Sequence, residues 1–120
     1  MKEADIMRLI QMDASNDGDR LFRNNVGALI DSRGIPVRFG LCIGSGDLIG
    51  WTSIEVTQEM VGSKIAVFSS FEVKTDKGKP KPEQTNFIHV VQAANGISGV
   101  VRSAADRKNI IDSYKRAERL

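Results

Sequence analysis

Glu72 and Lys74 place two charges near the end of the apolar run that begins at Ile65. Side chains two positions apart on a strand point to the same face, so these two charges are predicted to lie side by side. Charged groups beside apolar residues cost stability unless they are paired, solvated or bound to a metal. Taken alone, the pattern favours a strand that reaches solvent, where such a surface pair contributes less than about 1 kcal/mol.

A second carboxylate, Asp47, favours a catalytic interpretation. It follows a Gly-Ser-Gly turn at 44–46 and precedes two apolar residues. If the strands that carry Asp47 and Glu72 are neighbours, both carboxylates can bind one Mg²⁺ ion, which prefers one or two carboxylates together with water and phosphate oxygens. Lys74 would then orient the attacking water or stabilise the charge that develops on phosphorus. These residues therefore predict phosphodiester chemistry.

Three segments have the apolar spacing of amphipathic helices. They are residues 2–13, residues from about 80 to 94, and a final segment after Ser103 with apolar positions at Ile110, Ile111, Tyr114 and Ala117. Asn95 and Gly96 are predicted to close the second helix, because glycine accepts the left-handed conformation common at that position.

Each of the first two helices carries one polar residue on its apolar stripe. Glu3 shares the stripe of the 2–13 helix, where the alternative is a surface glutamate that complements the helix dipole. Gln84 is the polar member of a stripe continued by Phe87, Ile88 and Val91. Both polar side chains are therefore candidate functional residues.

The predicted strands are runs of β-branched and aromatic residues. They are 37–43, 47–51, 54–57 and 65–74, taken in series as an antiparallel meander, and 97–102. A short strand begins at Leu21, whereas 24–34 is rich in turn formers and is predicted to be irregular. This order of elements predicts one α/β domain, residues 1–120, with a mixed central sheet flanked by helices.

Composition limits the class of protein. The 120 residues carry 17 Lys and Arg against 15 Asp and Glu, so the net charge of +2 does not by itself indicate a nucleic-acid binder. No apolar run approaches the roughly 20 residues that a membrane span needs. The single cysteine, Cys42, and the lack of an export-signal pattern predict a cytoplasmic protein.

Five segments together give the chain a resemblance to a known nuclease family. They are 20–27 (RLFRNNVG), 44–50 (GSGDLIG), 72–75 (EVKT), Gln84 with 86–87 (NF), and 96–103 (GISGVVRS). Over nearly its whole length the chain resembles the virus-type replication-repair nuclease (VRR-NUC) domains of the PD-(D/E)xK nuclease superfamily. It departs from the superfamily pattern at Gly46, where the motif has a proline before the acid.

The resemblance implies a restriction-endonuclease-like core with a site for Mg²⁺, for which Mn²⁺ can substitute. In that site Lys74 is the motif lysine, Glu3 is the helix-borne acid near the metal, and Gln84 faces the site from the following helix. The residues implied to carry catalysis are Asp47, Glu72, Lys74 and Gln84, and those implied to bind metal are Glu3, Asp47, Glu72 and the carbonyl of Val73.

The implied activity is that of a structure-specific DNA endonuclease similar to Holliday junction resolvases, which act as homodimers on four-way junctions. Two-fold symmetry would supply the two active sites needed to cut both strands. The alternatives are a flap or single-strand nuclease and a non-catalytic DNA-binding module that keeps the fold.

Cationic and amide side chains flank the candidate site and are predicted to contact DNA phosphates. They are Arg20, Arg23 and Asn24 near the first helix and Lys77, Lys79 and Lys81 after the catalytic strand. The alternative role for the lysines is to keep a polar loop soluble.

Overall fold

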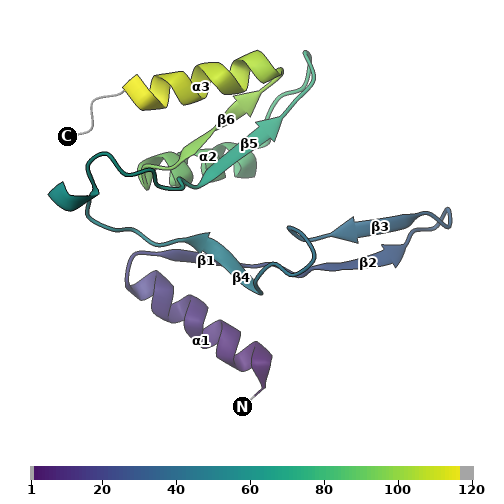
Figure 1. Cartoon of the computed structure of the whole chain (residues 1–120). Coiled ribbons are helices and arrows are strands. Elements are labelled where there is room, and N and C mark those ends of the chain that lie inside the picture. The colour runs from purple at the N-terminus through teal and green to yellow at the C-terminus, as the bar shows by residue number, and fades with distance from the viewer. Residues whose placement is uncertain (1, 117–120) are drawn as a thin grey trace. The chain divides into compact units, whose positions relative to one another are not determined.

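The computed structural model describes residues 2–116 and belongs to the α/β class (Figure 1). This part of the chain holds three α-helices, a 3-10 helix and six β-strands, which are arranged as three two-stranded sheets. The chain forms two compact units, residues 1–56 and residues 57–120. None of the helices described for residues 2–116 is long and apolar enough to span a membrane.

The first unit contains one helix and two antiparallel strand pairs. Its elements are α1 (Glu3–Asn16), β1 (Arg20–Arg23), β2 (Gly27–Ile30), β3 (Pro36–Phe39) and β4 (Leu48–Trp51). β1 pairs with β4, and β2 pairs with β3. The helix α1 packs against β1, where the side-chain amide of Gln11 donates to the carbonyl of Leu21 at 3.1 Å.

Asp31 holds the turn between β2 and β3. One of its carboxylate oxygens accepts the backbone N–H of Arg33 at 2.8 Å and that of Ile35 at 2.9 Å, while the other accepts the Arg33 guanidinium at 2.9 Å. The pKa of Asp31 is lowered below its ordinary value. The largest cause is the hydrogen bond from the Ile35 N–H, and the next is the hydrogen bond from the Arg33 side chain. Gly34 donates its N–H to the Asp31 carbonyl at 3.0 Å. This Asp-to-Gly turn explains why a hairpin forms in a segment predicted to be irregular.

The second unit contains a parallel strand pair with helices on both faces. Its elements are the 3-10 helix Gln58–Met60, β5 (Ser69–Val73), α2 (Pro82–Ala93), β6 (Ile97–Val101) and α3 (Ala104–Arg116). β5 and β6 pair in parallel, with Glu72 opposite Val100. The helix α2 forms the crossover that a parallel pair requires, and Figure 1 shows α2 and α3 on opposite sides of the two strands.

The predicted end of α2 is confirmed, although the left-handed residue is Asn95 and not the glycine. The helix closes where Asn95 adopts a left-handed conformation with φ of 64°, and the N–H of Gly96 donates to the carbonyl of Val91 at 2.9 Å. A Cβ at Gly96 would lie 2.8 Å from Val91 Cγ1 and 3.0 Å from the carbonyl oxygen of Phe68. Glycine is therefore required where the chain leaves α2 and enters β6.

The core of the described chain lies between β6 and its two helices. Its buried residues are Ile88, Val91, Ile97, Ser98 and Val101. The hydroxyl of Ser98 donates to the carbonyl of Ser70 at 2.7 Å, which satisfies the one polar side chain that is buried among residues 2–116. On the opposite face Gly99 allows α3 to approach closely, because a Cβ there would lie 2.8 Å from Ile110 Cδ1.

In the described residues, three separate strand pairs replace the predicted meander and single mixed sheet. β4 pairs with β1 rather than with a following strand, and 54–57 is not a strand. Ile54 and Val56 are 64% and 69% exposed, so their β propensity is not matched by a pairing partner. The strand predicted at 37–43 ends at Phe39, because Gly40 has a positive φ of 86°. Ala117, predicted for the last helix, lies outside the described residues.

Val91→Ala is expected to lower the free energy of unfolding by about 2 kcal/mol, because it removes two buried methyl groups and leaves a cavity. Chemical denaturation followed by circular dichroism measures the loss. The matched control is Val61→Ala, since Val61 is 70% exposed and its truncation should change stability by less than about 0.5 kcal/mol. Equal losses in the two variants would contradict this position of the core.

Candidate active site

Glu72, Lys74 and Gln84 form a hydrogen-bonded cluster in the second unit. The Lys74 ammonium lies 3.1 Å from Glu72 Oε1, and the side-chain amide of Gln84 donates to the same oxygen at 2.9 Å. The predicted adjacency of Glu72 and Lys74 is therefore confirmed. Their side chains are only 30% and 19% exposed, which is less exposure than a pair surrounded by solvent would have. The geometry thus favours a partly buried site over a simple surface pair.

The crossover helix brings Gln84 to β5. Gln84 lies in the first turn of α2, and its side-chain oxygen accepts the backbone N–H of Lys81 at 2.8 Å. With the amide oxygen held by the backbone, the amide nitrogen is turned toward Glu72. Gln84 therefore caps the helix and orients the carboxylate at the same time.

A hollow of about 190 Å³ opens beside Glu72. It is lined by Ser70, Glu72, Glu83, Gln84, Phe87 and Ile88. A water molecule takes up roughly 30 Å³ in the liquid, so the hollow has room for a hydrated ion. No hydrogen bond within residues 2–116 engages Glu72 Oε2. One carboxylate oxygen is therefore available for a ligand.

Ser70 and Glu83 line this hollow although the sequence analysis did not single them out. A signal for Ser70 exists, because it stands two positions before Glu72 and so shares the same face of the strand. Glu83 precedes Gln84 in the first turn of α2, but nothing local relates it to β5. Only the packing of the helix on the strand brings these side chains together.

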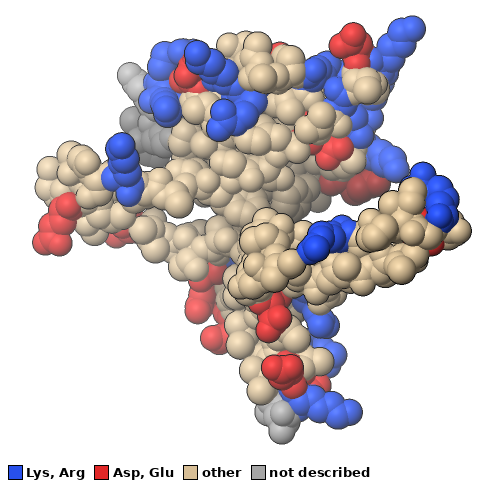
Figure 2. Space-filling model, turned by 45° about the vertical axis from the view of Figure 1, so that its right-hand side comes forward, with Lys and Arg blue, Asp and Glu red and all other residues tan. Residues whose placement is uncertain are grey.

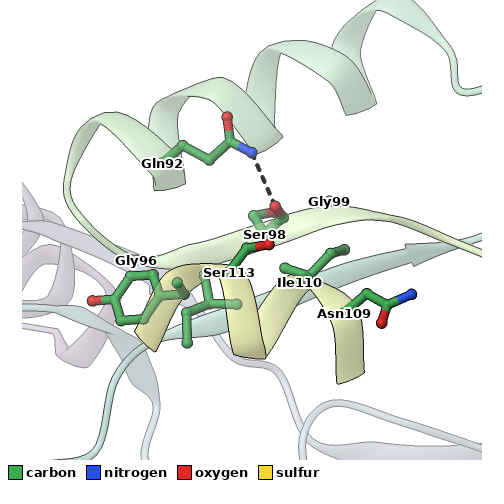
Figure 3. A pocket seen from close by; sticks show the side chains of 9 residues that line it. Gln92, Gly96, Ser98, Gly99, Asn109, Ile110 and Ser113 are labelled. Atoms are coloured by element: carbon green, nitrogen blue, oxygen red, sulfur yellow. Dashed lines mark hydrogen bonds between the residues drawn. The ribbon is translucent and has the colours of Figure 1, made fainter. Parts of the chain in front are cut away.

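A larger hollow, of about 470 Å³, lies between β6 and α3 (Figure 3). Its lining residues are Gln92, Gly96, Ile97, Ser98, Gly99, Asn109, Ile110, Ser113 and Tyr114. Figure 3 shows the side-chain amide of Gln92 donating to the Ser98 carbonyl, at 3.0 Å. None of the lining residues carries a carboxylate or a cationic group, which metal or phosphate binding needs. The smaller hollow beside Glu72 is therefore the candidate site.

Asn24 builds the loop that carries Asp47. Its side-chain nitrogen donates to the Ser45 hydroxyl at 2.7 Å and to the Gly46 carbonyl at 2.9 Å, and its side-chain oxygen accepts the N–H of Leu41 at 2.9 Å. Its backbone N–H donates to the Asp47 carbonyl at 2.8 Å. These bonds give Asn24, predicted as a DNA contact, a structural role, and they place Asp47 exposed at the start of β4.

The predicted metal ligands are divided between the two units. Glu3, in the first turn of α1, and Asp47 belong to the first unit, whereas Glu72 and Val73 belong to the second. Across residues 2–116, no three His, Cys, Asp or Glu side chains converge on a point that could hold a metal ion. The predicted DNA-contacting cations are all exposed: Arg20, Arg23, Lys77, Lys79 and Lys81.

Positive charge is concentrated in the second unit. Residues 57–120 hold eleven Lys and Arg against seven Asp and Glu, whereas residues 1–56 hold six against eight. The two net charges are therefore +4 and −2, and the near-neutral total conceals a basic unit. Figure 2 shows Lys and Arg side chains gathered over α3 and over the segment that follows β5.

Comparison with protein-family models, with curated proteins and with solved structures gives no match for this chain. The functional argument therefore depends on the chemistry of the cluster around Glu72 and on the charge that surrounds it.

Asn24→Ala is expected to loosen the loop that carries Asp47, because it removes three side-chain hydrogen bonds, each contributing about 1 kcal/mol to stability. The measurement is amide hydrogen exchange at Leu41, whose N–H would lose its acceptor. Asn25→Ala is the control, since Asn25 is exposed and is adjacent in the chain. Unchanged exchange at Leu41 in Asn24→Ala would refute the structural role.

Proposed function

We propose that the protein is a divalent-metal-dependent DNA nuclease with a restriction-endonuclease-like core, similar to VRR-NUC domains. The observation that carries the proposal is the Glu72 carboxylate, of which Lys74 and Gln84 hold one oxygen while the other is available beside a hollow. A partly buried carboxylate next to an ammonium suits metal-assisted hydrolysis of a phosphodiester. The net charge of +4 on the same unit supports a polyanionic substrate.

The metal, Mg²⁺ or Mn²⁺, would be held in the second unit by Glu72, with the Val73 carbonyl as a further ligand. The Glu72 carboxylate suits a hard cation, because within residues 2–116 no hydrogen bond engages its Oε2. When bound, the ion lowers the pKa of its water and stabilises charge on phosphorus.

Lys74 and Gln84 have separate roles in this proposal. Gln84 fixes the orientation of the Glu72 carboxylate, so that little reorganisation is needed when a ligand arrives. The Lys74 ammonium, 3.1 Å from that carboxylate, balances its charge and can donate a hydrogen bond to the attacking water or to a phosphate oxygen. Hydrolysis then forms one phosphorus–oxygen bond to water and breaks the bond to the leaving sugar oxygen, which takes up a proton.

The proposed substrate is branched DNA, and a four-way junction is the form that the resemblance favours. The exposed lysines of the segment after β5 would contact backbone phosphates, which orients DNA without reading its sequence. A flap or single-strand nuclease is the alternative, and a panel of substrates separates the two. A cytoplasmic location is part of the same proposal, because a chain with a single cysteine suits a reducing compartment.

A homodimer is part of the same proposal, since two active sites would allow paired cuts. The β2–β3 ribbon supports it, because Leu29 and Ile30 are 55% and 70% exposed there. A two-stranded ribbon is only marginally stable alone in water, and no other strand of the described residues pairs with the outer edges of this ribbon. A second copy of the ribbon, related by two-fold symmetry, can pair with one of these edges.

Glu72→Gln is expected to reduce metal-dependent DNA cleavage by at least about a hundredfold, because it removes the charge that binds the metal while keeping the size of the side chain. The measurement is cleavage of a labelled four-way junction beside linear duplex, flap and single-stranded DNA, with Mg²⁺ or Mn²⁺. Glu59→Gln is the matched control, since Glu59 is exposed in the 3-10 helix.

Symmetric paired cuts in the junction that disappear in Glu72→Gln would support a resolvase. If the protein cuts only flaps or single strands in a metal-dependent way, the proposal of a nuclease stands and the proposed substrate changes from the junction to the flap or single strand. If the wild-type protein cuts no DNA with either metal but still binds it, the non-catalytic binding module becomes the better proposal.

Ile30→Asp is expected to convert the dimer to a monomer, because it places a charge on the apolar ribbon. Light scattering during gel filtration should then give a mass near the 13.2 kDa of one chain, compared with twice that value for the wild type. Val61→Asp is the control, since Val61 is equally exposed but lies outside the ribbon. A wild-type protein that runs as a monomer would remove the homodimer from the proposal.

A further inference from the structure

Arg102 connects the end of β6 to the turn that follows β5. One nitrogen of its guanidinium donates to the carbonyl of Gly78 at 2.7 Å and to the carbonyl of Thr75. These carbonyls mark the two ends of a turn that is closed by a hydrogen bond from the Gly78 N–H to the Thr75 carbonyl at 3.1 Å. The Arg102 side chain therefore hydrogen-bonds to both ends of the turn, although it lies 24 residues further along the chain than Gly78.

The turn lies next to the aliphatic part of Lys74. A Cβ built at Gly78 would lie 3.5 Å from both Cβ and Cδ of Lys74, which is ordinary van der Waals contact. The backbone of Lys74 is held by β6, because its N–H donates to the carbonyl of Val101 at 3.0 Å. The turn therefore adjoins the side chain whose ammonium lies 3.1 Å from Glu72 Oε1.

The position of Arg102 is itself fixed by the start of α3. Its backbone N–H donates to Asp106 Oδ2 at 2.8 Å, and the N–H of Asp106 donates to the Ser103 hydroxyl at 3.1 Å. The Arg102 guanidinium forms no ion pair within residues 2–116, so the two turn carbonyls are its identified partners there. Both contacts come from a single nitrogen, so a lysine ammonium, which carries three donors on one nitrogen, can replace part of this arrangement, whereas a glutamine cannot bring a charged donor there.

We infer that Arg102 is a positioning residue for Lys74, acting through the Thr75–Gly78 turn. This role rests on the proposed nuclease function. Arg102 itself forms no hydrogen bond or ion pair with Glu72 or Lys74 and would act on the site only through the turn. Loss of the Arg102 contacts would free the turn and allow the Lys74 ammonium to move relative to the Glu72 carboxylate. A misplacement of about 1 Å at a catalytic group can lower a rate by about a hundredfold.

The test compares Arg102→Gln and Arg102→Lys with Lys108→Gln, which removes the same charge from an exposed position on α3. Cleavage is measured in single turnovers at saturating enzyme, on the DNA that the wild type cleaves fastest, and DNA affinity is measured separately with Ca²⁺ in place of Mg²⁺. Arg102→Gln should lower the cleavage rate constant at least about tenfold, whereas its Kd for DNA should change no more than in Lys108→Gln. Arg102→Lys should retain an intermediate rate constant.

A second measurement follows the turn itself. Amide hydrogen exchange at Gly78 should become at least about tenfold faster in Arg102→Gln and stay unchanged in Lys108→Gln, because the freed turn opens more often. If the loss of rate merely matched the unfolded fraction seen by circular dichroism, the positioning role would be wrong. If Arg102→Gln does not fold, Arg102→Met takes its place, because methionine keeps an unbranched side chain without any donor, and a cleavage rate constant in that variant equal to that of Lys108→Gln overturns the inference.

The inference and the proposed function can fail separately. A wild-type protein that cleaves DNA, together with an Arg102→Gln variant that cleaves as fast as Lys108→Gln, would overturn the positioning role and leave the nuclease in place. A wild-type protein that cleaves no DNA would overturn both.

Discussion

Parallel strands cannot be joined by a tight turn, and this constraint organises the second unit. Because β5 and β6 pair in parallel, the chain must cross one face of the pair as α2 before it enters β6. The first turn of α2 comes to lie beside the end of β5, where Gln84 reaches Glu72. Ligand sites in open α/β sheets form at the carboxyl ends of strands through the same geometry. The candidate site is thus a product of the crossover.

The cluster around Glu72 has the features of a site that is ready for a ligand. A fully exposed ion pair would contribute little, and an unpaired buried charge would be strongly destabilising. Glu72 lies between these limits, since an ammonium and an amide hold one oxygen while no hydrogen bond within residues 2–116 engages the other. The amide is in turn oriented by the backbone N–H of Lys81. The Glu72 carboxylate is therefore held in a fixed orientation while one of its oxygens can still accept a ligand.

The local features of the site were predictable from the sequence, whereas its surroundings were not. The two-residue period of a strand placed Glu72 beside Lys74, and the helical period placed Gln84 on the stripe that packs toward them. The pairing of β5 was not predictable, because β propensity identifies extended segments without naming their partners. The segment 54–57 illustrates this limit, since it has the composition of a strand and no pairing partner in the described chain.

The amino-acid sequence was sufficient for what depends on neighbours along the chain: the extent of α2, its closure at Asn95 and Gly96, and the shared face of Glu72 and Lys74. The tertiary structure decided which strands pair, which side chains line the hollow, and which distant residues hold the loops. Asn24 reaches a loop about 20 residues away, and Arg102 reaches a turn 24 to 27 residues away. Such contacts leave no periodic trace in a sequence, because they are set by the folding of separate elements against one another rather than by the spacing of residues within one element.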